Sequence, residues 1–423
     1  MAGMTTLPRR AALFALGVIF FANFLSYLDR TLVSALETPL KQAFNLDSSQ
    51  FGFLWTLFTL GYMVFAMPIG MLADRRNRPR ILALCVVVWS VATITSGWAP
   101  SSMVLYVSRF FIGVGEAGCL IIGQALIADY FRKEVRGRAL SMFHAAVPLG
   151  GTCAFIMAGA LGSRYDWREL FYIAGAPGFL VAALILLLVD PPRGGDQPHK
   201  AARTGLKAYL ELLKTPTLLF VIFGQAFAML ILICMIHFGV KFFTDERGMS
   251  PDQAKIFFGV MALVSGAVGA AVGGVFGDWL AKRVRGGYAL LAGVSYLAAL
   301  PLLLVGFHAS ERWLSFSALT AGSFCLFLCM PVLNAQIANV THPDQRGAAW
   351  ALAIFILHLF GDTFNPPLFG AVSDSHGRLN AYTWFSFSLI PAGVCCLIAS
   401  RYAGRDMDRL QSRENAPPPL SPV

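Results

Sequence analysis

Charged side chains are scarce in this sequence. Asp, Glu, Lys and Arg make up 13% of the 423 residues, whereas hydrophobic residues make up 57%. Because about a quarter of the residues in soluble domains are charged, this composition excludes an ordinary soluble protein. The sequence also lacks CxxC pairs and the Cys/His spacings of metal sites, and its eight cysteines lie in apolar stretches. We therefore expect the cysteines to pack as small hydrophobic groups, and we expect no metal or other cofactor.

Several motifs of hydrolases and acyltransferases are absent as well. The chain has no HExxH, GxSxG or His-x4-Asp pattern, so the sequence favours a protein that is not an enzyme. A channel or scramblase is a weaker alternative, because a channel needs a filter or a repeated ring of charges, and the two halves of this chain carry different charges in their apolar stretches.

Long hydrophobic runs are what the sequence has in abundance. Spanning a bilayer takes about 20 mostly apolar residues per helix, and unbroken runs favour helices over the alternating strands of a barrel. The sequence predicts an all-α integral membrane protein with twelve transmembrane helices, the first of which we expect to remain in the mature protein. The predicted spans are 11–36, 49–71, 81–99, 102–128, 138–162, 169–189, 216–240, 254–276, 287–306, 313–337, 347–371 and 381–400.

The net charge of +10 reflects membrane topology. With the N-terminus inside, 23 of the 33 basic residues fall in cytoplasmic segments and eight fall outside. This positive-inside asymmetry predicts that both termini are cytoplasmic, in a multi-pass protein of the cell (inner or plasma) membrane. The charge therefore indicates no nucleic-acid partner. The expected partners are the lipid bilayer, protons and a small amphipathic or anionic substrate, and we expect a monomer.

The two halves of the sequence resemble each other. The Pro/Gly-containing segment 191–215 separates six predicted spans from six, and "GMLADRRNRPR" (70–80) is echoed by "GGVFGDWLAKR" (273–283). We expect an N-terminal six-helix bundle at 1–190, a central cytoplasmic loop at 191–215, a C-terminal bundle at 216–402 and a disordered cytoplasmic tail at 403–423. Paired bundles of this kind place a substrate site between them and work by alternating access.

These motifs resemble those of the major facilitator superfamily. Its loop motif matches Gly70, Asp74, Arg75, Arg78 and Arg80, with Asn77 in place of the usual glycine, and "RFFIGVGEAG" (109–118) matches its fourth-helix pattern. The resemblance implies a twelve-helix fold of two bundles. We expect Gly70, Asp74, Arg75 and Arg78, with Asp278 and Lys282 of the second half, to act as a conformational latch at cytoplasmic helix ends.

A narrower resemblance is to the spinster-like branch of that superfamily. It is carried by "SYLDR" (26–30), "GVGEAG" (113–118) and "HLFGDTFNPPLFGAVSD" (358–374). The resemblance implies a secondary active transporter of lysophospholipids, sphingosine-phosphate-like lipids or other amphipathic anions, often coupled to protons. Symporters of sugar acids and protons also carry Asp-Arg in the first helix and Glu in the fourth, so they are the main alternative. A broad amphiphile or drug exporter also stays open.

Five charged residues lie well inside the predicted spans, away from their ends: Asp29, Arg30, Arg109, Glu116 and Asp362. Each costs about 2.5–3.5 kcal/mol at the centre of a membrane helix, so each needs a partner and is a functional candidate. Neighbouring residues differ by about 100° around a helix, so Asp29 and Arg30 cannot pair with each other. From their depths we predict the pairs Asp29–Arg109 and Arg30–Glu116, with Asp29 and Glu116 exchanging protons around Arg30.

A second candidate element lies in the eleventh span. His358 and Asp362 are four residues apart and share one helix face, and the "NPP" sequence at 365–367 should interrupt the helix beyond them. Together with Arg30 and Glu116 we expect His358 and Asp362 to bind substrate, with Tyr27 and Tyr62 lining an amphiphile cavity. His144, His237, Asn334 and Gln336 are weaker candidates.

Overall fold

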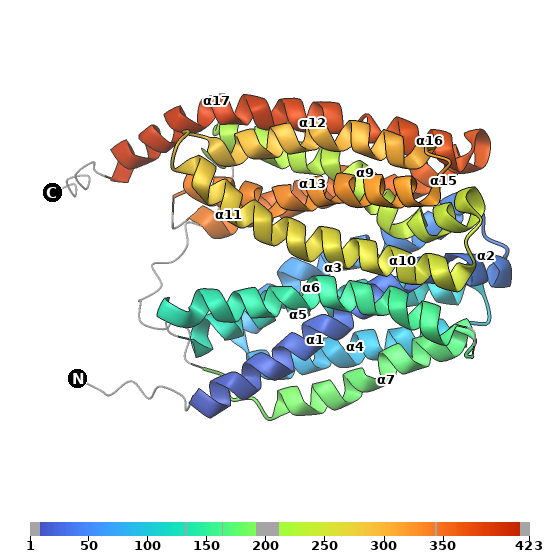
Figure 1. The fold of residues 1–423 in the computed structure, drawn as a ribbon. Coiled ribbons are helices and arrows are strands. Elements are labelled where there is room, and N and C mark those ends of the chain that lie inside the picture. Colours follow the sequence, from blue (N-terminus) through green and yellow to red (C-terminus); the bar gives the residue numbers. More distant parts are fainter. Residues whose placement is uncertain (1–8, 132, 163, 192–210, 343–344, 415–423) are drawn as a thin grey trace. The chain divides into compact units, whose positions relative to one another are not determined.

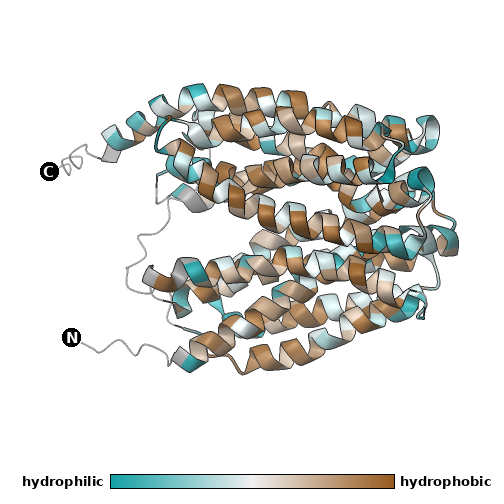
Figure 2. Cartoon of the chain, viewed as in Figure 1, coloured by the Kyte–Doolittle hydropathy of each residue, from teal (hydrophilic) through white to brown (hydrophobic). Residues whose placement is uncertain are grey.

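The computed structural model describes residues 9–131, 133–162, 164–191, 211–342 and 345–414, and these residues are helical almost throughout. It contains twelve helical segments long and apolar enough to cross a membrane, which confirms the predicted number. In Figure 2 hydrophobic residues run along the helices and hydrophilic residues gather at their ends. The helices are α1 (Arg9–Ala35), α2 (Glu37–Phe44), α3 (Ser48–Arg75), α4 (Arg78–Trp98), α5 (Ser102–Tyr130), α6 (Lys133–Leu161), α7 (Trp167–Leu186), α9 (Pro216–Arg247), α10 (Pro251–Leu263), η1 (Val264–Val268), α11 (Gly269–Ala281), α12 (Gly287–His308), α13 (Arg312–Asn339), α14 (Arg346–Leu357), η3 (His358–Asp362), α15 (Asn365–His376), α16 (Arg378–Ser386) and α17 (Leu389–Glu414).

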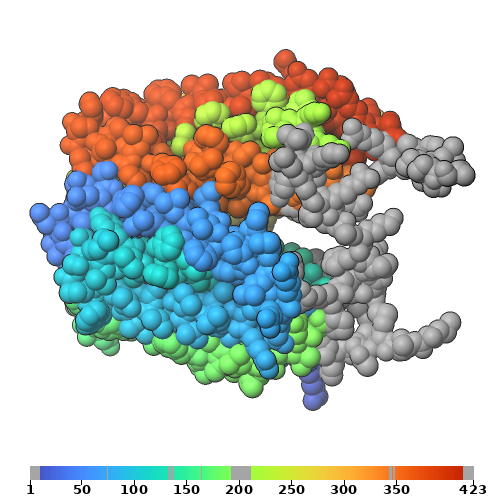
Figure 3. Space-filling model, turned by 180° about the vertical axis from the view of Figure 1, so that it is seen from behind, coloured from blue at the N-terminus to red at the C-terminus, as the bar shows by residue number. Residues whose placement is uncertain are grey.

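The chain divides into two compact units. Unit 1 consists of Met1–Pro198, Ile233–Leu263 and Thr363–Ala381. In it α5 packs between α3 and α4, α1 packs on α6, and α10 and α15 pack on α6 and α3 (Figure 1). Figure 3 shows one face of unit 1, formed by the helices coloured blue to cyan. Unit 1 therefore combines the first six spans with parts of spans 7, 8 and 11 and the first residues of span 12.

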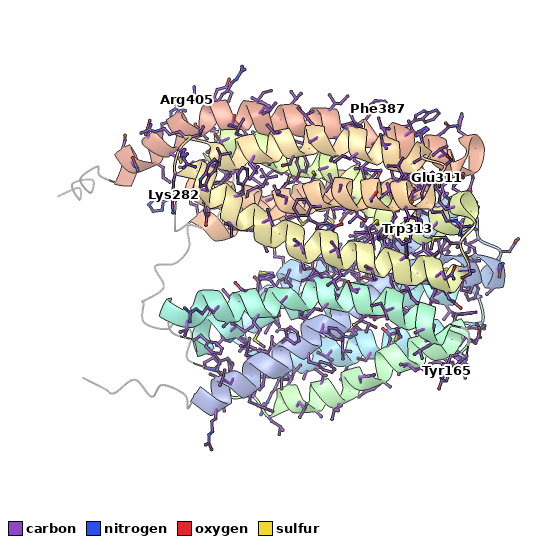
Figure 4. The ribbon with its side chains drawn as sticks, viewed as in Figure 1. Tyr165, Lys282, Glu311, Trp313, Phe387 and Arg405 are labelled. Carbon is purple, nitrogen blue, oxygen red and sulfur yellow. The ribbon has the colours of Figure 1, made fainter. Side chains whose placement is uncertain are left out.

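Unit 2 consists of His199–Leu232, Val264–Asp362 and Tyr382–Val423. Its central helix is α12, which packs against α13 and α17, while α11 packs on α13. Figure 4 places the basic side chains Lys282 and Arg405 at one end of this unit and Glu311 near the other. The boundary between the units differs from the one expected from the sequence. The predicted bundles at 1–190 and 216–402 stay a prediction.

Two short π-helices lie at the boundary between the units. In span 8, η1 begins directly after Leu263, the last residue of that unit 1 segment. In span 11, η3 ends at Asp362, and unit 1 resumes at Thr363. Prolines follow in the first turn of α15, where a missing N–H costs little. The expected interruption of span 11 at the "NPP" sequence is therefore confirmed.

The expected disorder of the tail is wrong for its first part. Helix α17 continues to Glu414. It is held at the start of α9 by Asp406, whose carboxylate accepts hydrogen bonds from the backbone N–H (3.1 Å) and the hydroxyl (2.7 Å) of Thr217. A carboxylate at a helix N-terminus satisfies free backbone donors there, and this contact buries Asp406. Residues 415–423 lie outside the described residues, as does most of the central loop (192–210).

Candidate functional site

The centre of unit 1 holds a buried ion pair between α1 and α5. The Arg30 guanidinium donates from Nε (3.1 Å) and Nη2 (2.9 Å) to Oε2 of Glu116. The Glu116 side chain is 0% exposed, whereas that of Arg30 is 15% exposed. This contact confirms the pairing expected from the sequence, and it leaves the cation as the more accessible partner.

Aromatic rings surround the same guanidinium. Its Cζ lies 4.5 Å from the ring centre of Tyr27, 4.8 Å from Phe58 and 5.5 Å from Tyr62. A cation near several ring faces keeps favourable electrostatic contacts even when it loses its carboxylate partner. Tyr27 and Tyr62 were predicted to line the site. Phe58 was not, because among 35 phenylalanines no pattern in the sequence distinguishes it.

Small residues of "GVGEAG" bring α5 close to its neighbours and so position Glu116. A Cβ on Gly115 would lie 2.6 Å from the carbonyl oxygen of Cys85 and 2.7 Å from the backbone nitrogen of Trp89, both on α4. Gly113 makes an equally close approach to the backbone of α3 at Phe58. Close backbone packing through small residues is the usual way in which membrane helices associate, and here it holds the carboxylate in a fixed position.

Asp29 has a different partner from the one expected. Its Oδ2 accepts a hydrogen bond from the hydroxyl of Thr93 on α4, and no ion pair with Arg109 is formed among the described residues. The physical reason is the 100° step between neighbouring residues, which turns Asp29 toward α4 while Arg30 faces α5. The Thr93 hydroxyl lies within an apolar helix and gave no charge signal in the sequence.

Arg109 is buried beside this cluster. Its side chain is among the largest fully buried ones, its Cζ lies 5.5 Å from the ring centre of Phe58, and Asp29 and Glu116 are the carboxylates that act on its charge. Its Nε and Nη1 have no hydrogen-bond partner within the described part of the chain. Asp29, Arg30, Arg109 and Glu116 together carry a formal charge of zero, so adding one proton or one anion changes the net charge of a buried site.

The second candidate element lies in unit 2. Nδ1 of His358 is 2.9 Å from both carboxylate oxygens of Asp362. The His358 side chain is 17% exposed and that of Asp362 is 0% exposed. The two residues are the ends of η3, and π-helical turns are frequent at functional sites. The expected contact on one helix face is therefore present.

The predicted latch residues make contacts within their own units. Arg78 donates to Asp129 (2.5 Å) and Asp190 (2.7 Å), so it joins the start of α4 to the end of α5 and the segment after α7. Asp278 accepts a hydrogen bond from the Tyr288 hydroxyl (2.6 Å). The nearest atom to a Cβ on Gly70 would be a methyl carbon of Ile121. Arg75 and Lys282 lie at helix ends, and the Asp74 side chain lies outside the described set. The latch itself stays a prediction.

Polar contacts not foreseen from the sequence join the helices at the α2 end of unit 1. Arg378 donates to Glu37 (3.2 Å) and to the carbonyl of Phe238 (3.2 Å). Asp374 accepts from the backbone N–H (2.7 Å) and the hydroxyl (2.5 Å) of Ser48. These contacts tie residues of α9, α15 and α16 to α2 and α3.

A buried histidine extends the polar residues of the same region. Nδ1 of His237 on α9 lies 2.5 Å from the hydroxyl oxygen of Ser34 on α1, and its ring centre lies 4.5 Å from that of Trp55 on α3. The sequence singled out His237 only weakly, because its partners come from distant parts of the chain. Within the described residues no cluster of three or more His, Cys, Asp or Glu residues could hold a metal ion.

Comparison with known proteins identifies the family. Residues 19–362 match the model of the Major Facilitator Superfamily. The chain is 27% identical to Protein spinster of Drosophila melanogaster over 86% of this chain, and it spans 62% of that protein. It is 28% identical to the sphingosine-1-phosphate transporter SPNS2 of Xenopus tropicalis over 92% of this chain and 79% of that protein.

A solved structure shares the fold. The crystal structure of a bacterial homolog of the human lysosomal transporter Spinster, in an inward-facing and unoccupied conformation, superposes with a TM-score of 0.81. The two chains are 24% identical, and the match covers 97% of this chain and 100% of the other. The chain belongs to the Major Facilitator Superfamily of multi-pass membrane proteins, and within it the chain is similar to the spinster proteins.

Proposed function

We propose that this transporter moves an amphipathic anion, such as a lysophospholipid or a sphingosine-phosphate-like lipid, by alternating access coupled to protons. The observation that carries the proposal is the unequal burial of the Arg30–Glu116 pair, in which the cation is 15% exposed and the carboxylate 0%. An anionic headgroup can therefore reach the guanidinium, whose planar fork matches phosphate or carboxylate oxygens.

The proton enters this scheme through the carboxylate that the headgroup displaces. Once a substrate anion binds to Arg30, the Glu116 carboxylate is left with a buried negative charge that no longer has a cation beside it. Protonation removes that cost, so substrate and proton favour each other's binding. Asp29 is a second proton acceptor in this scheme, because its carboxylate is buried and accepts a hydrogen bond from a neutral hydroxyl. Substrate binding and protonation both shift the same equilibrium between arrangements of the bundles.

An amphipathic substrate is favoured over a sugar acid by the surroundings of Arg30. The side chains around the guanidinium are the aromatic rings of Tyr27, Phe58 and Tyr62, of which Tyr27 is partly exposed. A sugar-acid site needs hydroxyl and amide groups around most of the ligand. We also propose that the α2 end of unit 1 faces outside, as the distribution of basic residues predicts, so that Glu37–Arg378 and Ser48–Asp374 close the outer side.

Transport into proteoliposomes tests the proposal. A lysophospholipid and a sugar acid are each supplied with and without an imposed pH gradient. We expect gradient-dependent movement of the lysophospholipid, and sugar-acid transport alone would contradict the substrate class. The double variant Glu116→Gln, Asp29→Asn should lose substrate-driven proton flux, whereas Asp408→Asn, which removes an exposed carboxylate, should not. Unchanged flux in a well-folded double variant would contradict the coupling.

A further inference from the structure

Unpartnered polar atoms continue from the charged cluster toward the α2 end of unit 1. Within the described residues these are Oδ1 of Asp29, Nε and Nη1 of Arg109, Nε1 of Trp55 and Nε2 of His237. All four side chains are at most 8% exposed. Buried polar atoms without a protein partner are typical positions for bound water, because leaving them without any hydrogen bond is costly.

Ring contacts connect three of these side chains, Arg109, Trp55 and His237, and the charge of Arg109 acts on Asp29 as well. Phe58 lies near the guanidinium of Arg109 (5.5 Å) and against Trp55 (5.1 Å), and Trp55 lies against His237 (4.5 Å). The charge of Arg109 acts on His237. His237 thus lies between the charged cluster and Ser34, to which its other ring nitrogen is bonded.

Ser34 also lines a cavity. A pocket of about 330 Å³ is lined by residues of α1, α2, α9 and α10, among them Ser34, Glu37, Lys241, Asp252 and Lys255. Oε2 of Glu37, which is 2% exposed, has no hydrogen-bond partner among the described residues. The pocket therefore has polar groups for water, and Ser34 belongs both to its wall and to the contact with His237.

We propose that Ser34 and His237 form a route by which protons pass between this pocket and the carboxylate of Asp29. The proposal rests on the proton coupling put forward above and adds its path on the α2 side. In the neutral tautomer that carries the ring hydrogen on Nε2, the Ser34 hydroxyl donates to Nδ1 of His237. As Nδ1 takes the hydroxyl proton, Nε2 releases its own through a water to the Asp29 carboxylate, and Ser34 regains a proton from a hydronium ion in the pocket. The ring then returns to its first tautomer before the next transfer.

The charges around His237 keep this transfer concerted. Arg109 faces it from α5, Asp29 is the acidic group of α1 in this region, and α3 contributes the neutral Trp55. On the pocket side the charged groups are Glu37, Lys241, Asp252 and Lys255. An imidazolium beside the Arg109 guanidinium would be repelled, so His237 exchanges one proton for another and stays neutral. The charge of Arg109 thereby hinders a leak of protons through His237 when no carboxylate is free to accept them.

Sided membrane vesicles test this route with the full-length protein. Right-side-out and inside-out vesicles are loaded with a pH-sensitive dye, and proton movement driven by a lysophospholipid is recorded at varied pH on each face. We expect His237→Gln to slow this movement by about tenfold or more and to remove its dependence on the pH at the α2 face. Dependence on the pH at the other face should remain. Ser34→Ala should behave like His237→Gln, and Ser34→Thr, which keeps a hydroxyl, should restore the flux.

Controls separate this route from folding and from the coupling itself. His308→Gln removes an exposed histidine at the end of α12 and should leave the flux unchanged. Lysophospholipid binding by the His237 and Ser34 variants should stay within about twofold of wild type, which verifies their folding. A folded His237→Gln protein with wild-type flux and wild-type pH dependence at both faces overturns the route alone. Wild-type protein that moves substrate without protons overturns the coupling and the route together.

Discussion

Replacing Arg30 by methionine should destabilise the protein more than neutralising its partner. The change leaves the Glu116 carboxylate, which is 0% exposed, without the two charge-assisted hydrogen bonds that it accepts. Removing one partner of a buried ion pair costs about 3–5 kcal/mol. Glu116→Gln instead leaves a cation that is 15% exposed and contacts three rings, so its cost should be about 1–2 kcal/mol.

The double variant Arg30→Met, Glu116→Gln should therefore be about 2 kcal/mol more stable than Arg30→Met alone. Thermal unfolding in detergent, followed by size-exclusion chromatography, ranks the four proteins. The deficit of Arg30→Met should also shrink as the pH falls from 8 to 5, because protonation removes the stranded charge. If Arg30→Met and the double variant unfold at the same temperature, or if Glu116→Gln is the least stable, the reasoning about unequal burial is refuted.

Three further predictions concern packing and charge elsewhere in unit 1. Gly115→Ala should reduce the yield of folded protein on size-exclusion chromatography, because its methyl would overlap α4, whereas Gly17→Ala, with no atom within 4 Å, should not. Arg78→Met should lower the free energy of unfolding by about 2–4 kcal/mol, because it leaves the carboxylates of Asp129 and Asp190 without their cation. An unchanged unfolding temperature would contradict this. Burial raises the pKa of Glu37 above its ordinary value. The contribution of this group to folding stability is therefore complete at a pH below the ordinary pKa, and it is lost as the pH rises through the raised pKa. Backbone hydrogen exchange in α2, corrected for intrinsic rates, should accordingly be slower at pH 5 than at pH 8, and Glu37→Gln should abolish the difference.

The fold could be predicted from the sequence because a bilayer imposes strong constraints on it. Twelve apolar runs gave twelve spans, and depth together with helical periodicity gave the Arg30–Glu116 contact. The partner of Asp29 could not be found in this way, because a threonine in an apolar helix carries no charge or spacing signal. The helical extension of α17 was missed for a related reason: it depends on Thr217, nearly two hundred residues earlier in the chain.

His237 shows the same limit in the candidate site. A lone histidine in an apolar span is compatible with packing or with chemistry, and only its neighbours decide between them. Those neighbours are Ser34 and Trp55, on two helices of the first half of the chain. Periodicity places residues on one helix face, but it does not say which faces of distant helices meet.

The π-helical turns at the unit boundary have a consequence for inhibition. Spans 8 and 11 each pass from one unit to the other at a five-residue π turn, η1 or η3. In these two spans the backbone that joins the units is π-helical, and its hydrogen bonds are wider than those of an α-helix, so a change in the arrangement of the units would bend spans 8 and 11 most easily at these turns. A small molecule that stiffens η1 would then arrest the transport cycle without occupying the substrate site, and raising the substrate concentration would not overcome it.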